Sequence, residues 1–336
     1  GWGNLVSSIE PSRFNMFLPA DHPDFPWIGM VFAPPIIGIW YWCTDQYIVQ
    51  RVLSASDIHQ ARKGTIFAGY LKLLPIFMFF IPGLIAYAMS KSGQMDYGSS
   101  DQVFPTLVRE LLPTGMRGLV AGGLLAALMS SLSSVFNSCS TLFTMDIYKK
   151  LNPGASERKL VFVGRIATGV VVLSGILWIP FMKAVSSGGL YTYLQSVQAY
   201  IAPPIASVFL LGLFWSRINA TGAFTALVSG FSAGMIRLGL EINKNSLDTS
   251  GVLHAIADLN FLYFAIVSFV VCIIILIAVS MATEEPDYER IKGLTYDTVD
   301  KGKESGDHSR DKIHSYLILI ILALILIYFS PLGIGG

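Results

Sequence analysis

The chain has 336 residues, of which 53% are hydrophobic and only 13% are charged, and its mean hydropathy is +0.59. The charged fraction is about half that of an ordinary soluble domain, and several uncharged runs reach about twenty residues, enough for a helix to cross a bilayer. The composition therefore excludes a soluble domain and predicts an all-α integral membrane protein. A net charge of +1, carried mostly in loops, gives no reason to expect a nucleic-acid partner.

The predicted elements divide the chain into four regions. Residues 1–26 are expected to be an extracellular or periplasmic loop, 27–282 a core of seven transmembrane helices, 283–314 a charged cytoplasmic linker and 315–336 a last transmembrane helix. Lysine and arginine are more numerous in the loops after spans one, three and five, which places those loops inside the cell and both termini outside. The chain opens without methionine or a signal peptide, so we expect it to be incomplete at its N-terminus. The eight expected spans lie near residues 27–49, 66–89, 116–146, 160–181, 191–214, 221–239, 261–282 and 315–330.

The sequence contains no constellation typical of an enzyme. Its five histidines are scattered in loops or at span ends, and it has no phosphate-binding glycine loop, HExxH or nucleophile elbow. The three cysteines, Cys43, Cys139 and Cys272, all lie inside apolar spans and are expected to be small buried residues. We therefore expect transport rather than catalysis, with no cofactor.

The third span carries a run of hydroxyl side chains. Ser130, Ser134, Asn137, Thr141 and Thr144 follow spacings of four and three, so a helix presents them on one stripe. Such a stripe can bond neighbouring helices, or it can form an ion path, because a hard cation prefers oxygen ligands. Spacing alone favours helix packing.

Lys72 is the strongest single signal, because it lies nine residues beyond Lys63 and therefore roughly 14 Å further along a helix, near mid-bilayer. Pro75 frees the carbonyl of Leu71 in the same turn. A functional lysine and a structural lysine bonded to such carbonyls are equally compatible with this pattern.

Two other spans contain polar or aromatic groups beside prolines. In the first span, Pro34-Pro35 and Gly38 precede Tyr41 and its neighbouring tryptophans, which predicts a discontinuous helix around a mid-membrane site, although these rings also suit interfacial anchors. In the fifth span, Gln195 and Gln198 share a helix face and require partners, either another helix or a hydroxylated ligand.

Four blocks give the chain a close resemblance to the sodium–glucose cotransporter branch of the solute:sodium symporter family. They are WYWCTDQYIVQRVLSA (40–55), GYLKLLPIF (69–77), AALMSSLSSVFNSCSTLFTMDIYKK (126–150) and YLQSVQAYIAPPIASVFLLGLFW (193–215). The resemblance implies the LeuT-type inverted-repeat fold, with spans one to five forming the second five-helix repeat, three further helices following it, and the first repeat missing.

The resemblance also implies site roles. Tyr41 resembles the inner-gate aromatic that stacks on the sugar, while Lys72 and Gln195 resemble side chains that bond sugar hydroxyls. Gly38 stands where relatives often place Asn or Thr, and Gln198 where the glucose transporters usually have Thr, so both positions bear on which sugar is bound. The shared sodium site would use the hydroxyls of Ser130 and Ser131 and the carbonyl of Ala127.

These residues predict sodium-coupled symport of a small hydroxylated solute, such as glucose or galactose, by alternating access in a multi-pass protein of the plasma or inner membrane. The expected partners are the sugar, sodium and the lipid bilayer. One alternative is a sodium symporter of myo-inositol, an amino acid or a carboxylate. The others are a sugar sensor on the same fold that does not transport, and a passive channel.

Overall fold

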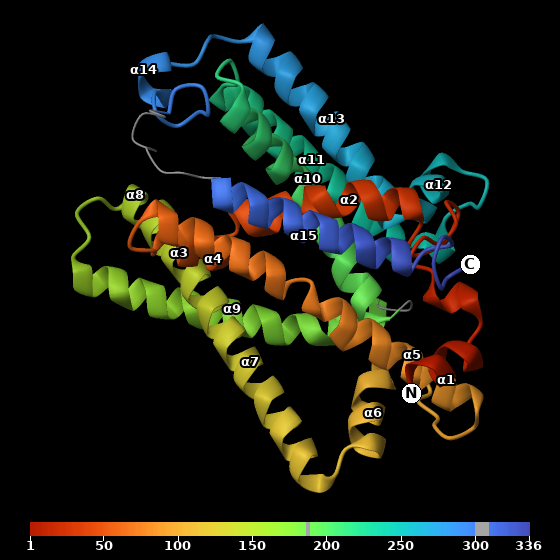
Figure 1. Cartoon of the computed structure of the whole chain (residues 1–336). Helices are drawn as coiled ribbons and strands as arrows, with labels where there is room; N and C mark the ends of the chain where they lie inside the picture. Colours follow the sequence, from red (N-terminus) through yellow and green to blue (C-terminus); the bar gives the residue numbers. More distant parts are fainter. Residues whose placement is uncertain (186–188, 300–308) are drawn as a thin grey trace. The chain divides into compact units, whose positions relative to one another are not determined.

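A computed structural model describes residues 1–185, 189–299 and 309–336 as helices joined by loops, and the described residues contain no β-strand (Figure 1). Eight stretches of this described chain are long and apolar enough to cross a membrane, at the positions predicted from the sequence. The chain divides into two compact units, Gly1–Pro75 with Tyr191–Gly336 and Ile76–Leu190. Residues 300–308 of the predicted linker lie outside the described residues.

The first unit contains most of the spans. Its elements are α1 (Trp2–Ser8), η1 (Pro11–Phe14), α2 (Trp27–Ile39), η2 (Trp40–Thr44), α3 (Gln46–Leu53), α4 (Ile58–Leu71), α10 (Leu190–Phe214), α11 (Ala220–Ile242), η6 (Lys244–Ser246), α12 (Val252–Asp258), α13 (Phe261–Ala282), α14 (Tyr288–Ile291) and α15 (Ser309–Tyr328). The second unit contains η3 (Ile76–Phe80), α5 (Ile81–Lys91), η4 (Ser100–Gln102), α6 (Val103–Leu111), α7 (Thr114–Leu142), η5 (Phe143–Tyr148), α8 (Lys149–Leu151) and α9 (Glu157–Val185).

The core of the first unit lies where α2, α10 and α13 meet. Small residues allow these helices to approach closely: Ala33 of α2 and Ala199 of α10 are fully buried, and a Cβ at Gly29 would lie 2.8 Å from Leu262 of α13. Without water to drive association, close backbone contact of this kind is a main source of stability between transmembrane helices.

Helix α11 carries a stripe of small residues that the sequence analysis missed. Gly222, Ala226, Gly230 and Gly234 recur every four residues and are all buried. A Cβ at Gly230 would lie 2.6 Å from both Pro204 of α10 and the Cys272 sulfur of α13, and one at Gly234 would lie 2.5 Å from the carbonyl oxygen of Tyr200. The stripe therefore lets α11 contact both neighbouring helices.

Replacing Gly230 with alanine is expected to destabilise the first unit by about 1–3 kcal/mol, because the proline ring and the sulfur it meets belong to packed helices that must move apart. Thermal unfolding of the purified protein in lipid nanodiscs measures this. Gly239→Ala on the same helix is the matched control, since nothing lies within 4 Å of the added Cβ. Equal melting of the two variants would contradict the close packing at Gly230.

The N-terminal segment packs against the end of α15. Trp2 donates from its indole N–H to the Tyr328 hydroxyl at 3.0 Å, and its ring meets Phe14 and Phe329 edge to face. Phe14 and Phe329 are fully buried. Residues 1–26 thus contain two short helical elements, α1 and η1, and α15 starts at Ser309, ahead of the predicted position 315.

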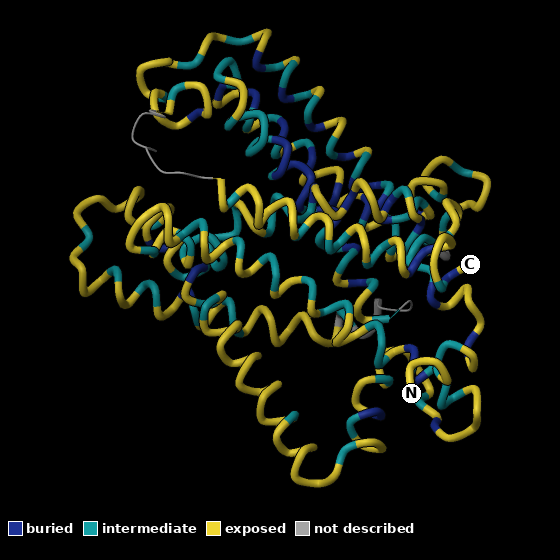
Figure 2. The backbone as a smooth tube through the Cα atoms, in the orientation of Figure 1, coloured by how far each residue is buried: buried dark blue, intermediate teal, exposed yellow. Residues whose placement is uncertain are grey.

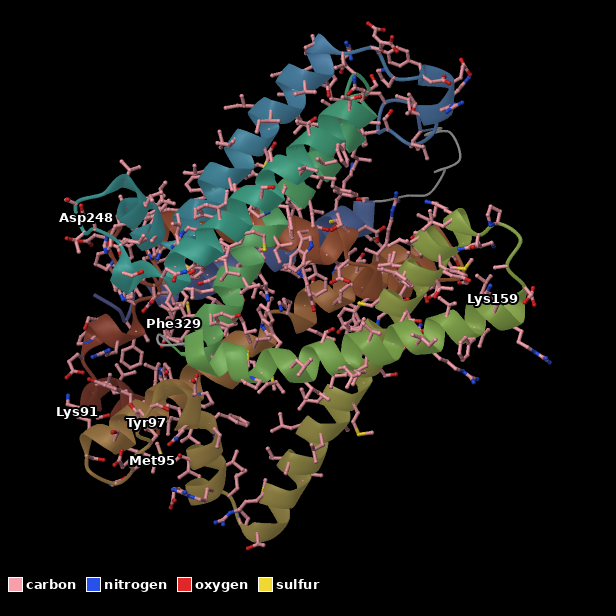
Figure 3. The ribbon with its side chains drawn as sticks, turned by 180° about the vertical axis from the view of Figure 1, so that it is seen from behind. Lys91, Met95, Tyr97, Lys159, Asp248 and Phe329 are labelled. Atoms are coloured by element: carbon pink, nitrogen blue, oxygen red, sulfur yellow. The ribbon has the colours of Figure 1, made fainter. Side chains whose placement is uncertain are left out.

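In the second unit, the long third span is confirmed. Helix α7 has 29 residues, which correspond to about 43 Å, more than the roughly 30 Å hydrocarbon core. Figure 2 shows α7 exposed along most of its length. Met95, with Tyr97 packed beside it in the α5–α6 connection, joins Ala86 and Leu107 in a small core (Figure 3). The short helix α6 lies between the second and third spans.

Candidate functional site

The first span is interrupted, but later than its prolines suggest. Pro34 and Pro35 lie inside α2, which continues into the π-helical turn η2 and ends where Asp45 adopts an extended conformation. Asp45 then caps α3 by accepting a hydrogen bond from the Tyr47 N–H at 3.0 Å. Tyr41 therefore lies within the irregular turn itself, and π-helical turns of this kind are frequent at functional sites.

The second span is interrupted at Lys72. Helix α4 starts at an Asp57 cap, whose carboxylate accepts the Gln60 N–H at 2.8 Å, a bond that lowers the pKa of Asp57. The helix ends at Leu71, and Lys72 lies in the turn before Pro75. Proline cannot supply the N–H that would continue the helix, so the sequence itself dictates an irregular backbone around the lysine.

Trp42 contacts a residue at each of these two helix interruptions. The Lys72 ammonium lies 5.5 Å from the centre of the Trp42 ring, and the Tyr41 ring meets the same tryptophan edge to face with centroids 5.2 Å apart. The structure therefore brings Tyr41 and Lys72, from different spans, to one aromatic residue. Trp42 was not among the predicted site residues, although its place in the WYW run beside Gly38 was the available signal.

Gly38 leaves room at this site. A Cβ added there would meet only the Trp42 ring, at an ordinary contact distance of 3.9 Å. A larger side chain would thus be accommodated, and the glycine keeps the space beside the aromatic residues open.

Gln195 and Gln198 lie on α10 of the same unit, at the edge of its buried face. Both side chains are partly exposed, and neither amide bonds any other part of the described chain. Amides in an apolar span need hydrogen-bond partners, which another helix or a ligand can supply. No measured contact joins them to Lys72 or Trp42.

The predicted sodium ligands lie on α7 in the second unit. Ser130 and Ser131 are exposed, and among the described residues neither hydroxyl has a hydrogen-bond partner. Ala127 lies one turn before them on the same helix. Helix α7 holds the three predicted sodium ligands close together in the second unit. The residues predicted to bind the solute lie in the first unit.

Other hydroxyls of α7 take the packing role instead. Ser140 donates to the Gly164 carbonyl of α9 at 2.7 Å, and Thr144, in the turn η5 that follows α7, is buried beside the same glycine. Ser134 donates within its own helix to the Ser130 carbonyl at 3.0 Å. The hydroxyl-rich helix thus combines a packing half with an exposed half that contains the serine pair.

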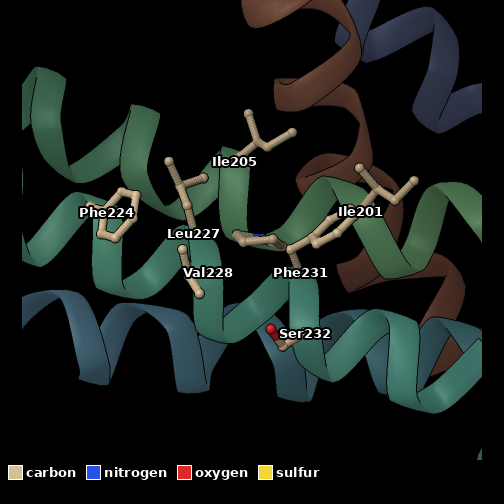
Figure 4. Close-up of a pocket in the computed structure, with 8 residues that line it drawn as sticks. Ile201, Ile205, Phe224, Leu227, Val228, Phe231 and Ser232 are labelled. Atoms are coloured by element: carbon tan, nitrogen blue, oxygen red, sulfur yellow. The ribbon is translucent and has the colours of Figure 1, made fainter.

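A groove between α10 and α11 is unsuited to a sugar. It has a volume of about 380 Å³, and Ile201, Ile205, Phe224 and Phe231 line it with other apolar residues and Ser232 (Figure 4). Sugar hydroxyls buried there would lack partners, at a cost of roughly 1–3 kcal/mol each.

Comparison with known proteins gives a consistent result. The profile of the sodium:solute symporter family matches residues 3–230. The human sodium/myo-inositol cotransporter 2 is 41% identical over 303 residues, covering 85% of this chain and 45% of the relative. The sheep sodium/glucose cotransporter 1 is 42% identical, with 81% and 43% covered, and the bovine sodium/mannose cotransporter SLC5A10 is 40% identical, with 90% and 54% covered. The chain spans about half the length of these curated relatives.

Proposed function

Because the chain belongs to the sodium:solute symporter family, we propose that it is part of a transporter that couples the movement of a small hydroxylated solute to that of sodium. The solute is a monosaccharide such as glucose or galactose. The relatives named for glucose, mannose and myo-inositol all handle neutral polyols of this size, which supports the class.

The observation that carries the proposal is the joined set of Tyr41, Trp42 and Lys72 at two interrupted spans. Interrupted transmembrane helices are the usual hosts of solute sites in secondary transporters. An aromatic face suits the apolar side of a sugar ring, and an ammonium supplies three donors to its hydroxyls. Gln195 and Gln198 add further bonds, and Gly38 leaves space that sets which sugar fits.

Sodium is the co-transported ion in this proposal, and the Ser130 and Ser131 hydroxyls with the Ala127 carbonyl are its ligands. Ion and solute favour the same conformers, so each raises the affinity for the other. Rocking of the helix bundle then exposes the solute inward. The protein acts without a cofactor in the plasma or inner membrane, with the lipid bilayer as its surroundings.

Uptake into proteoliposomes tests this proposal. The full-length protein, given labelled glucose and an inward sodium gradient, is expected to accumulate the sugar above its external concentration, and an equal potassium gradient is expected to give none. Uptake that does not depend on the sodium gradient would indicate a channel, and sugar binding without accumulation would indicate a sensor. Competition by galactose, mannose, myo-inositol, an amino acid and a carboxylate then identifies the solute class.

A further inference from the structure

A polar cluster of two buried residues, Tyr200 and Arg237, and the partly exposed Glu241 joins α10 to α11 in the first unit. The Tyr200 hydroxyl donates to Glu241 Oε2 at 2.5 Å, and Arg237 Nη1 lies 3.7 Å from the same oxygen. Tyr200 is 1% exposed and Arg237 3% exposed. A charge so far from solvent is tolerated only while its partners stay in place, because separating them leaves it uncompensated.

Arg237 extends the cluster to α13. Its guanidinium lies 5.6 Å over the Tyr200 ring and 6.0 Å over the Phe264 ring, and Nη2 donates to the Leu259 carbonyl at 2.8 Å. A cation near the end of a span is expected to extend to the membrane surface, but this one packs inward. The cluster therefore fastens α10, α11 and the start of α13 at one level.

The backbone of α10 is weakest at the same level. Pro203 and Pro204 lack the N–H groups that would bond the carbonyls of Ala199 and Tyr200. The freed Tyr200 carbonyl lies against Gly234 of α11. Residues 190–202 are thus joined to the rest of α10 by fewer backbone bonds, and prolines inside a helix are the common site of bending.

We propose that Tyr200 and Glu241 form a latch that fixes residues 190–202 of α10 against α11 and thereby positions Gln195 and Gln198 for the solute. This inference rests on the proposed function for its consequence, but the latch itself is a property of the helices. Tyr200 and Glu241 are positioning residues, because they act on the solute through α10. Arg237 supplies the charge that holds Glu241 in place.

Tyr200→Phe tests the latch, because it keeps the ring that packs on Arg237 and Phe264 and removes only the hydroxyl. The solute concentration for half-maximal uptake is expected to rise at least about fivefold, while the maximal rate and the sodium half-saturation measured at saturating solute stay unchanged. Amide hydrogen exchange in 191–202 is expected to accelerate, while exchange in 205–214 is not. Combining the change with Glu241→Ala should add little to this rise, since each substitution removes the Tyr200–Glu241 hydrogen bond.

Ser207→Ala is the matched control, because it removes a buried hydroxyl on α10 beyond the prolines that bonds only the Pro204 carbonyl of its own helix. It should change neither readout. Wild-type half-saturation in Tyr200→Phe would overturn the positioning role, whatever the exchange rates. If the wild type moves no solute, the proposed function fails and exchange alone decides: faster exchange in 191–202 supports the latch, and equal exchange overturns it.

Discussion

Replacing Lys72 with alanine is expected to raise the solute concentration for half-maximal uptake by about tenfold to a hundredfold. Hydrogen bonds from a charged group contribute about 1.5–3 kcal/mol each, and each 1.4 kcal/mol is a factor of ten in affinity. The Trp42 ring, whose centre lies 5.5 Å from the ammonium, positions it without occupying its N–H donors. The substitution therefore lowers the affinity for the solute by the full value of the lost hydrogen bonds. Initial rates of labelled glucose uptake over a range of concentrations provide the measurement.

Lys63→Ala is the control for Lys72, because both lysines belong to the same span and are exposed in the first unit. It should leave half-saturation within about twofold, since a solvated surface lysine contributes little. If Lys72→Ala behaved like this control, Lys72 would be a structural lysine, and the solute site would have to be sought elsewhere.

Replacing Ser131 with alanine is expected to raise the sodium concentration for half-maximal uptake by at least about tenfold. A sodium ion that loses one oxygen ligand loses an interaction of the size of a charged hydrogen bond. Uptake at a fixed sugar concentration and varied sodium measures the change, and saturating sodium should restore most of the rate. Unchanged sodium dependence would remove Ser131 from the ligand set.

Ser140→Ala separates a ligand from a packing hydroxyl on the same helix. Its hydroxyl donates to the Gly164 carbonyl of α9, so the change should lower thermal stability by about 1 kcal/mol and leave sodium half-saturation unaltered. A sodium effect as large as that of Ser131→Ala would mean that the whole hydroxyl stripe serves the ion.

Hydropathy sufficed to predict the eight spans, because an uncharged apolar run of about twenty residues is typical of a transmembrane helix. The first span was predicted to be discontinuous from its prolines and glycine, but the two prolines lie inside α2, and the backbone changes only at the aromatic turn that follows. A proline removes one backbone hydrogen bond of a helix, but packing against neighbouring helices determines where the helix ends.

The sequence did not indicate which side chains of different helices would be in contact. Lys72 was recognisable from its depth, yet its contact with Trp42 depends on how α4 approaches η2. The contacts of Arg237 with Tyr200, Phe264 and the Leu259 carbonyl could not be predicted from its own span, because those partners lie on other helices or loops. The glycine stripe of α11 carried a readable signal, four small residues at a spacing of four, and marks helix contact in any membrane protein.

The pairing of Trp2 with Tyr328 has a consequence for biosynthesis. These two residues are separated by 326 positions, and the rings of Phe14 and Phe329 meet Trp2 in the same cluster. Trp2 and Phe14 leave the ribosome long before Phe329 is synthesised, so this part of the first unit stays incomplete until α15 has been made. Contacts this distant in the chain form slowly. The nascent protein must therefore keep these early aromatic side chains from wrong partners until α15 is available.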